Sequence, residues 1–203
     1  MTQPSTLVDR VVNAKLASIL KSSGFRKAGR NFRRSTTTSL QIMNIQASAW
    51  NSQNSARFTV NLGAHFPCVA EVTGDPPQTA APVHYRCHVN IRIGDLQPVG
   101  LDRWWEIAAE EDVAQIANDV SATVSNFGLP FLDSLGDAEK SCDYLRSRQF
   151  HWMACAISMS VGNLESAARD LARALQDPPR SELTDRLRQW AQSRGLEPRN
   201  LVV

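Results

Sequence analysis

Apolar and polar residues alternate at two different periods along this chain, and the period distinguishes predicted helices from predicted strands. In residues 5–22 the apolar positions recur every three or four residues, and the same spacing returns in residues 112–127. Such spacing places apolar side chains along one face of a helix. Gly24 and Gly128 follow these segments, and Gly24 stands where a left-handed C-terminal cap belongs. Two amphipathic helices are therefore predicted.

A period of two indicates strands in the middle of the chain. Residues 39–62 form two alternating runs joined by a polar turn at residues 50–52, which predicts a β-hairpin. The apolar side of the first run changes near Ile42 and Met43, so we expect a β-bulge or a twist there. Residues 87–93 alternate in the same way and predict a strand beside the hairpin.

The connecting segments give weaker patterns. Residues 25–34 suggest two short extended pieces around a turn at Ala28-Gly29, with an edge strand over residues 31–36. Residues 63–82 contain four prolines and are expected to form a long irregular loop. Residues 101–105 resemble one helical turn.

From Ser134 onward the spacing is helical and no strand pattern returns. Helices are predicted over residues 141–161, 164–176 and 181–193. The boundary is placed at Gly136-Asp137, so that residues 1–135 form an α+β domain and residues 136–203 form a C-terminal helical region packed on it. The predicted fold class is α+β, with an antiparallel sheet of about four strands packed on two helices and followed by the helical region.

Composition indicates an ordinary globular protein. The 203 residues are 42% hydrophobic and 21% charged, and no apolar run approaches the ~18 residues of a membrane span. The N-terminus has no leader-peptide pattern, so a cytoplasmic protein is expected. Four irregularly spaced cysteines favour free thiols over a disulfide framework, and no cofactor is expected.

The net charge of +2 conceals a strong asymmetry along the chain. Residues 1–34 carry eight Lys and Arg against one Asp, whereas residues 95–139 carry one Arg against ten acids. Such blocks can complement each other within a fold or attract charged partners. Internal complementation is the first interpretation.

A basic and aromatic cluster lies in the first of these blocks. Its cations are Lys21, Arg26, Lys27, Arg30, Arg33 and Arg34, interleaved with Phe25 and Phe32. Clusters of this kind can hold phosphate groups and stack bases, which suggests a nucleic-acid or phosphorylated-ligand binding protein. The alternative is a solvated rim that faces the acidic block, and the low total charge favours it.

A second candidate site is the polar face of the predicted sheet. Its members are Asn44, Gln46, Ser48, Thr59, Asn61, His88, Asn90 and Arg92, with Trp50, Trp104 and Trp105 near its ends. The polar face of an antiparallel sheet is usually just solvated. Tryptophan and arginine beside neutral polar groups also suit recognition of a protein partner.

Metal binding and catalysis have less support. A repeated His-x-x-Cys pattern, His65 with Cys68 and His84 with Cys87, has the residue types of a zinc site. However, Cys87 continues the inward side of its predicted strand, where a buried cysteine needs no metal. No nucleotide-binding, hydrolase or redox motif occurs. An enzyme built on His88 and Arg92 remains a third hypothesis.

Residues 24–105 resemble a bacterial family known as domain of unknown function 4304. The resemblance rests on residues 24–27, 31–32, 44–52, 58–63, 87–94 and 102–105, which occur in the family's order. It implies no established activity and no metal site, while its bacterial setting leaves a role as an immunity protein open.

A single helical pair is similar to part of another family. Residues 162–179 are similar to the second half of one tetratricopeptide repeat. Since about three repeats are needed to build a peptide groove, a helical hairpin over residues 141–179 is expected instead.

The expected function is therefore a non-enzymatic cytoplasmic protein-interaction module with an unidentified protein partner and no membrane association. One form would be an immunity-type neutraliser of a bacterial effector.

Overall fold

The structure is a computed structural model that describes residues 4–49, 51, 55–75, 82–178 and 181–198. The chain divides into two units. The first unit comprises Met1–Thr36, Leu40–His65 and Ala81–Asp133. The second comprises Thr37–Ser39, Phe66–Ala80 and Ser134–Val203.

An antiparallel sheet forms the first unit, and its strand order is β1-β2-β3-β4-β5, with β6 also pairing with β4. The strands are β1 (Arg26–Ala28), β2 (Asn31–Ser35), β3 (Leu40–Ala47), β4 (Ala56–His65), β5 (Val89–Arg92) and β6 (Trp105–Ile107). The predicted α+β class is confirmed. The described residues form six strands, and β2 is not an edge strand because β1 pairs beside it.

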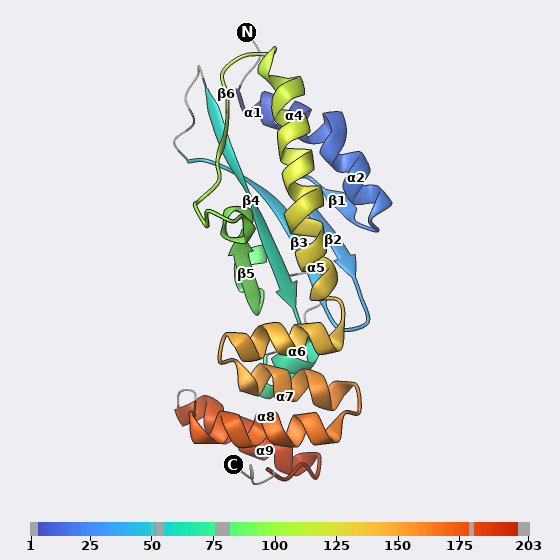
Figure 1. Cartoon of the computed structure of the whole chain (residues 1–203), viewed down its shortest axis with the longest axis vertical. Coiled ribbons are helices and arrows are strands. Elements are labelled where there is room, and N and C mark those ends of the chain that lie inside the picture. The colour runs from blue at the N-terminus through green and yellow to red at the C-terminus, as the bar shows by residue number, and fades with distance from the viewer. Residues whose placement is uncertain (1–3, 50, 52–54, 76–81, 179–180, 199–203) are drawn as a thin grey trace. The chain divides into compact units, whose positions relative to one another are not determined.

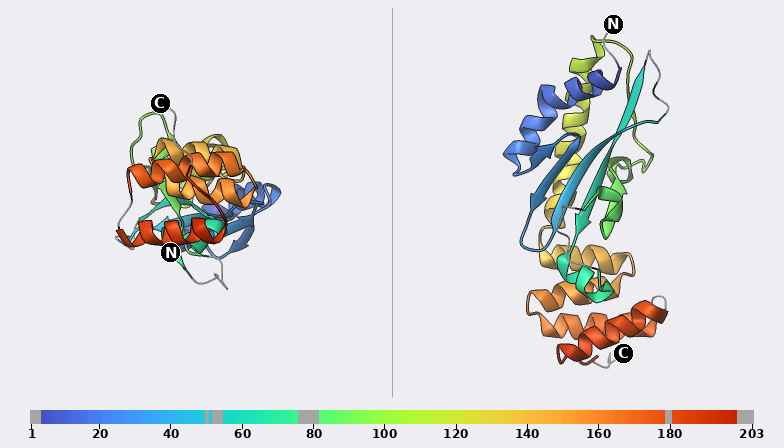
Figure 2. Two further views of the ribbon diagram at one scale, coloured as in Figure 1. Left: turned by 90° about the horizontal axis from the view of Figure 1, so that it is seen from below. Right: turned by 180° about the vertical axis from the view of Figure 1, so that it is seen from behind.

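Two long helical segments cover one face of this sheet (Figure 1). The first runs from α1 (Pro4–Val11) through a π-helical turn, Val12–Leu16, into α2 (Ala17–Ser22). The second runs from α4 (Asp112–Thr123) through a π-helical turn, Val124–Gly128, into α5 (Leu129–Ser134). Seen from behind, the strands lie in front of α4 (Figure 2).

The core of the first unit lies between these helices and the sheet. Its buried side chains include Val8, Val11, Leu16, Leu20, Phe32, Met43, Ile45, Phe58, Val60, Leu62, Val120 and Val124. Burying one large apolar side chain fully is worth about 1.5–3 kcal/mol. The apolar stripes predicted for the helices and for the second hairpin strand are the surfaces that meet here.

The two glycines predicted to end helices behave differently. Gly24 has φ +85 and ends the first helical segment, as expected. Gly128 stays inside the second segment, so the predicted helix end is wrong. A Cβ on Gly128 would lie 3.3 Å from Ile93 and 3.6 Å from Met43. The missing side chain therefore allows the helix to pack closely on the sheet.

The hairpin strands pair without interruption, from Leu40 opposite His65 to Ala47 opposite Phe58. The predicted bulge near Ile42 is therefore wrong. Ile42 points away from the helices and is still only 1% exposed. Ile42 is apolar because its position on this other face of the sheet is buried too.

Residues before β5 and β6 also differ from expectation. Cys87 precedes β5 and follows a short 3₁₀ helix, His84–Arg86. Residues 101–104 have no regular structure, so the predicted helical turn is wrong, and β6 begins at Trp105.

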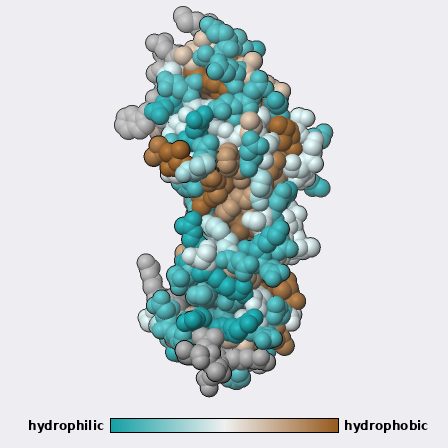
Figure 3. All heavy atoms as spheres, viewed as in Figure 1, coloured by the Kyte–Doolittle hydropathy of each residue, from teal (hydrophilic) through white to brown (hydrophobic). Residues whose placement is uncertain are grey.

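The second unit contains α3 (Pro67–Thr73), α6 (Ala138–Ser147), α7 (His151–Ser160), α8 (Leu164–Gln176) and α9 (Ser181–Ser193). The helix α3 lies in the segment predicted to be an irregular loop. The helix predicted over residues 141–161 is broken at Gln149, which has φ 65. The bounds of α8 and α9 match the predicted ones. In the view of Figure 3, most of the described surface of this unit is hydrophilic.

No helix among the described residues is both long and apolar enough to cross a membrane.

Candidate functional site

The face of the sheet that points away from the helices, here called the outer face, collects polar side chains. The strand register places Asn44 opposite Asn61 and Gln46 opposite Thr59. Asn61 in turn lies opposite Arg92 on β5. Because directly paired residues point to the same side of a sheet, these five side chains share the outer face.

The amide side chains of the outer face form a hydrogen-bonded row across three strands. Asn44 Nδ2 donates to Asn31 Oδ1 at 2.8 Å. Asn61 Nδ2 donates to Asn44 Oδ1 at 3.2 Å and to Gln46 Oε1 at 2.8 Å. Asn61 and Thr59 are buried, at 3% and 0% exposure, so they fix their neighbours rather than contact a partner. The row is therefore held in one arrangement before any ligand arrives.

Trp104 lies at the β6 end of the outer face and carries two arginine side chains over its ring. The guanidinium carbons of Arg92 and Arg57 lie 5.3 and 5.6 Å from the ring centroid. Trp104 Nε1 donates to Asp102 Oδ2 at 2.8 Å, and Arg92 donates to the same carboxylate. Cation–π contacts and charge-assisted hydrogen bonds thus fix a half-buried indole ring.

Trp105 does not belong to this face, and its inclusion among the predicted site residues is wrong. It is 4% exposed and stacks on Phe58 with ring centroids 5.5 Å apart. Its Nε1 donates to Asp119 Oδ2 at 2.7 Å. Trp105 is the first residue of β6 and pairs opposite Phe58, so its side chain shares the helical side of the sheet with Phe58. Trp105 is a core residue.

The remaining predicted members are spread along the strand ends. Ser48 follows β3 and its backbone N–H donates to the Arg57 carbonyl at 2.8 Å. Asn90 is exposed on β5. His88 stacks on His65 with ring centroids 4.6 Å apart. Trp50 lies outside the described residues.

Comparison with known families finds a match that covers most of the first unit. The model of the family described as "Domain of unknown function (DUF4304)" matches residues 16–134, which is more than half of the chain. The chain belongs to this family. The match contains all six described strands and extends beyond the resembling residues 24–105 on both sides. No curated protein and no solved structure matches the chain.

The four residues of the predicted zinc site do not form a cluster in this DUF4304 member. Cys68 lies on α3 in the second unit, whereas His65, His84 and Cys87 lie in the first. The described residues contain no group of three or more His, Cys, Asp or Glu positioned to hold a metal ion. Burial lowers the pKa of His84.

Cys87 lies against Gly63, on the outer face. The Cys87 Sγ atom is 2.8 Å from the position that a Cβ on Gly63 would take. Since Gly63 alternates with Leu62, the prediction that Cys87 points inward with the core side chains is wrong. Burial raises the pKa of the Cys87 thiol to about 12, so the group remains a neutral packing element at ordinary pH.

Three cations of the predicted basic cluster point to the helical side and have partners there. Lys27 Nζ donates to Asn13 Oδ1 at 2.5 Å. Arg30 makes two hydrogen bonds to the Asp9 carboxylate, at 2.7 and 3.1 Å. Arg34 bonds Gln41 Oε1 at 2.7 Å, the Ser23 carbonyl at 2.9 Å and the Asp133 carboxylate. These cations stabilise the fold.

The other two arginines of the cluster have a different environment. Arg26 and Arg33 lie directly opposite each other on β1 and β2, and Arg33 is opposite Ile42 on β3. Both therefore share the outer face. Phe25 and Phe32 are buried, so the expected stacking of bases on these rings is wrong. Among the cations of residues 26–34, Arg26 and Arg33 are left unpaired, while Lys21 is exposed on α2. These residues do not form a continuous basic and aromatic surface.

Two residues of the Trp104 site, Arg57 and Asp102, were not among the sequence candidates. Arg57 stands out in the sequence as the charged residue at the start of an apolar alternating run. Asp102 lies in the segment that resembles the family, but its role depends on the hydrogen bonds that it accepts from Arg92 on β5 and from Trp104. The alternating pattern of the sequence could therefore have indicated Arg57, but not Asp102.

Proposed function

We propose that this chain is a protein-interaction module that binds a protein partner through the outer face of its sheet, without catalysing a reaction. The observation that carries the proposal is Trp104, held by Arg57, Arg92 and Asp102 beside the hydrogen-bonded amide row. Fixed side chains lose little conformational freedom on binding, which leaves more of the contact energy as affinity.

The residue types at this end of the outer face support the same function. Tryptophan and arginine dominate the binding energy of protein interfaces when they lie within a polar surround. Trp104 is half-buried, so part of its ring is open to a partner, and Arg57 beside it is exposed. The amide row supplies fixed polar groups next to this anchor.

An immunity-type neutraliser of a bacterial effector is the specific form of this proposal. Such a protein acts by covering a partner's surface, so it needs a rigid binding face and no reactive group. The outer face supports this role because the hydrogen bonds among Asn31, Asn44, Gln46 and Asn61 hold its amide side chains in a rigid arrangement. A toxin encoded by the neighbouring gene would be the first partner to test.

The test is affinity capture from native lysate with three purified baits. The wild-type chain is expected to retain a stoichiometric partner. Trp104→Ala should weaken that complex by about 2 kcal/mol or more, which is roughly thirtyfold in dissociation constant. Phe150→Ala removes an exposed aromatic ring in the second unit and should change nothing.

Equal retention by Trp104→Ala and wild type would remove Trp104 from the binding site. Failure of the wild-type chain to retain any stable partner would contradict the proposed function itself.

A further inference from the structure

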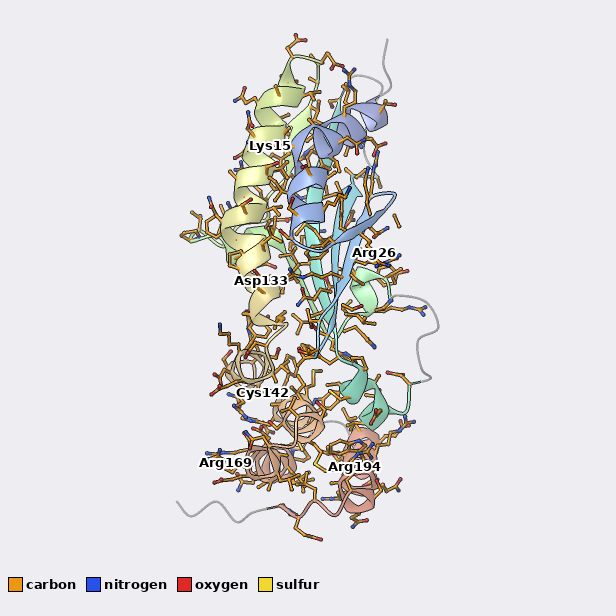
Figure 4. The ribbon with its side chains drawn as sticks, turned by 90° about the vertical axis from the view of Figure 1, so that its right-hand side faces the viewer. Lys15, Arg26, Asp133, Cys142, Arg169 and Arg194 are labelled. Carbon is orange, nitrogen blue, oxygen red and sulfur yellow. The ribbon has the colours of Figure 1, made fainter. Side chains whose placement is uncertain are left out.

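The β1 and β2 end of the sheet contains a hollow of about 500 Å³. Its lining residues are Gly24, Arg26, Lys27, Ala28, Arg33, Arg34, Ser35, Leu40, Gln41 and Ile42. In Figure 4 the labelled Arg26 lies on the opposite side of the sheet from the labelled Lys15 on the helical side. By strand register Arg33 shares the side of Arg26.

Three arginines line this hollow, and two of them, Arg26 and Arg33, lack counter-ions among the described residues. Among the described residues, no Asp or Glu makes an ion pair with Arg26 or Arg33, whereas Arg10, Arg30 and Arg34 of the same unit each make one. The Arg33 Nε atom is buried and has no hydrogen-bond partner in the described part of the chain. Like charges directly opposite each other on neighbouring strands also destabilise a sheet. The positions of Arg26 and Arg33 thus lower the stability of the protein when no ligand is bound.

We propose that this hollow binds the phosphate group of a small phosphorylated ligand. A guanidinium group offers a planar fork of N–H donors that matches two phosphate oxygens. A dianion between Arg26 and Arg33 would neutralise both charges. The Ser35 hydroxyl, which lines the same hollow, adds a further donor.

A small ligand fits this site better than a nucleic-acid strand. A strand needs a series of cations along its backbone and aromatic rings for its bases. Here Lys27, Arg30 and Arg34 are bonded on the helical side, and the two phenylalanines are buried. Two neighbouring free arginines suit one phosphate group, and Leu40 and Ile42 give the hollow an apolar wall.

This site is separate from Trp104 and does not depend on the proposed partner binding. Its test is calorimetric titration of the whole chain with inorganic phosphate and with AMP at constant ionic strength, together with a thermal-shift assay. Binding is expected, with a phosphate-dependent rise in melting temperature, because a ligand that binds only the folded state stabilises it. Sodium chloride at equal ionic strength should not produce the rise.

The variants Arg26→Gln and Arg33→Gln should each weaken AMP binding about tenfold or more, since each removes charge-assisted hydrogen bonds. Arg33→Lys keeps the positive charge but loses the planar set of N–H donors. Its affinity for AMP should lie between those of Arg33→Gln and the wild type. Arg188→Gln removes one positive charge from an exposed helix of the second unit and should bind as wild type. Without phosphate, Arg26→Gln should melt no lower than wild type, because the charge repulsion across the strands is gone.

The inference is overturned if the wild-type chain binds neither probe, or if Arg188→Gln loses as much affinity as Arg33→Gln. It is also overturned if a fluorescein-labelled oligo-dT binds more tightly than AMP with a steep salt dependence, since that identifies a nucleic-acid backbone as the source of the phosphate. None of these results bears on partner capture through Trp104.

Discussion

At the scale of single residues, Gly63 explains why the first hairpin strand has a misleading pattern. Ile42 lies opposite Gly63 on the outer face, and Cys87 lies against Gly63. An apolar residue is therefore buried on both faces of β3, although most of one face is polar. Alternation alone cannot show this, because the covering segment comes from a distant part of the chain.

A side chain at position 63 would collide with Cys87. Gly63→Ala should lower the free energy of unfolding by about 1–3 kcal/mol, the usual cost of overpacking. The new Cβ would lie 2.8 Å from Cys87 Sγ and 3.1 Å from Cys87 Cβ. In a Cys87→Ala background the Sγ conflict is absent, so urea denaturation should show a smaller loss for the same substitution.

The control for this double-mutant cycle is Cys87→Ala alone, which supplies the reference stability. An identical loss from Gly63→Ala in both backgrounds would mean that Cys87 does not lie over Gly63.

At the scale of elements, helices with strong local signals were predictable and those fixed by tertiary packing were not. The helix α9 and the helix α8 begin and end where the spacing and the flanking proline or glycine residues indicate. The continuation of α4 through Gly128 depends on the sheet that it meets. The break at Gln149 uses a positive φ at a residue that gives no sign of it in the sequence. The α3 helix has Pro67 at its first turn and Gly74 at its cap, a local signal that the proline-rich surroundings concealed.

An ion pair between a half-buried arginine and a buried aspartate connects helices in the second unit. Arg146 on α6 makes two hydrogen bonds to the Asp170 carboxylate on α8, at 3.0 and 2.8 Å. The same guanidinium bonds Ser166 Oγ at 2.7 Å and Asp143 Oδ1 at 2.9 Å. These bonds to Asp170 raise the pKa of Arg146, which therefore stays charged. The helical hairpin is held by a polar contact as well as by its apolar core.

Asp170→Asn should therefore destabilise the protein by about 2–3 kcal/mol, because it removes the buried carboxylate that accepts two hydrogen bonds from Arg146 and leaves only the exposed Asp143 as its acidic partner. The matched control is Asp185→Asn, which breaks an exposed pair with Arg188 on α9. An exposed pair contributes at most about 1 kcal/mol. Urea denaturation measures the free energy of unfolding of both variants. Equal losses of stability would contradict a larger contribution from the Arg146–Asp170 pair than from the exposed pair.

At the scale of the whole molecule, the opposite charge blocks of the sequence complement each other in part, as the first interpretation expected. Arg10 pairs with Glu110 at 2.6 Å, and Arg34 pairs with Asp133. The sequence predicted that such pairs would form, but it could not show which cations would be left over. The strand register decides that, since it turns Lys27 and Arg34 to the helical side and Arg26 and Arg33 to the outer face.

The candidate site was predictable to a similar extent. The alternating pattern identified which residues of β4 and β5 lie on the polar face of the sheet. The family match places all six described strands in one domain. Neither could show that Trp105 enters the core while Trp104 stays outside, or that Thr59 and Asn61 are buried beneath their neighbours. Those outcomes depend on contacts between strands that lie far apart in the sequence.

The proposed binding face is the outer face of the sheet. Hydroxyl-radical footprinting of the captured complex, with mass-spectrometric readout against the free chain, tests it most directly because oxidation reports side-chain exposure. Oxidation of Trp104 is expected to fall in the complex, whereas oxidation of Tyr144, which lies on α6 in the second unit, should stay unchanged. Protection confined to residues of α1 and α4, with Trp104 oxidised as in the free chain, would contradict it.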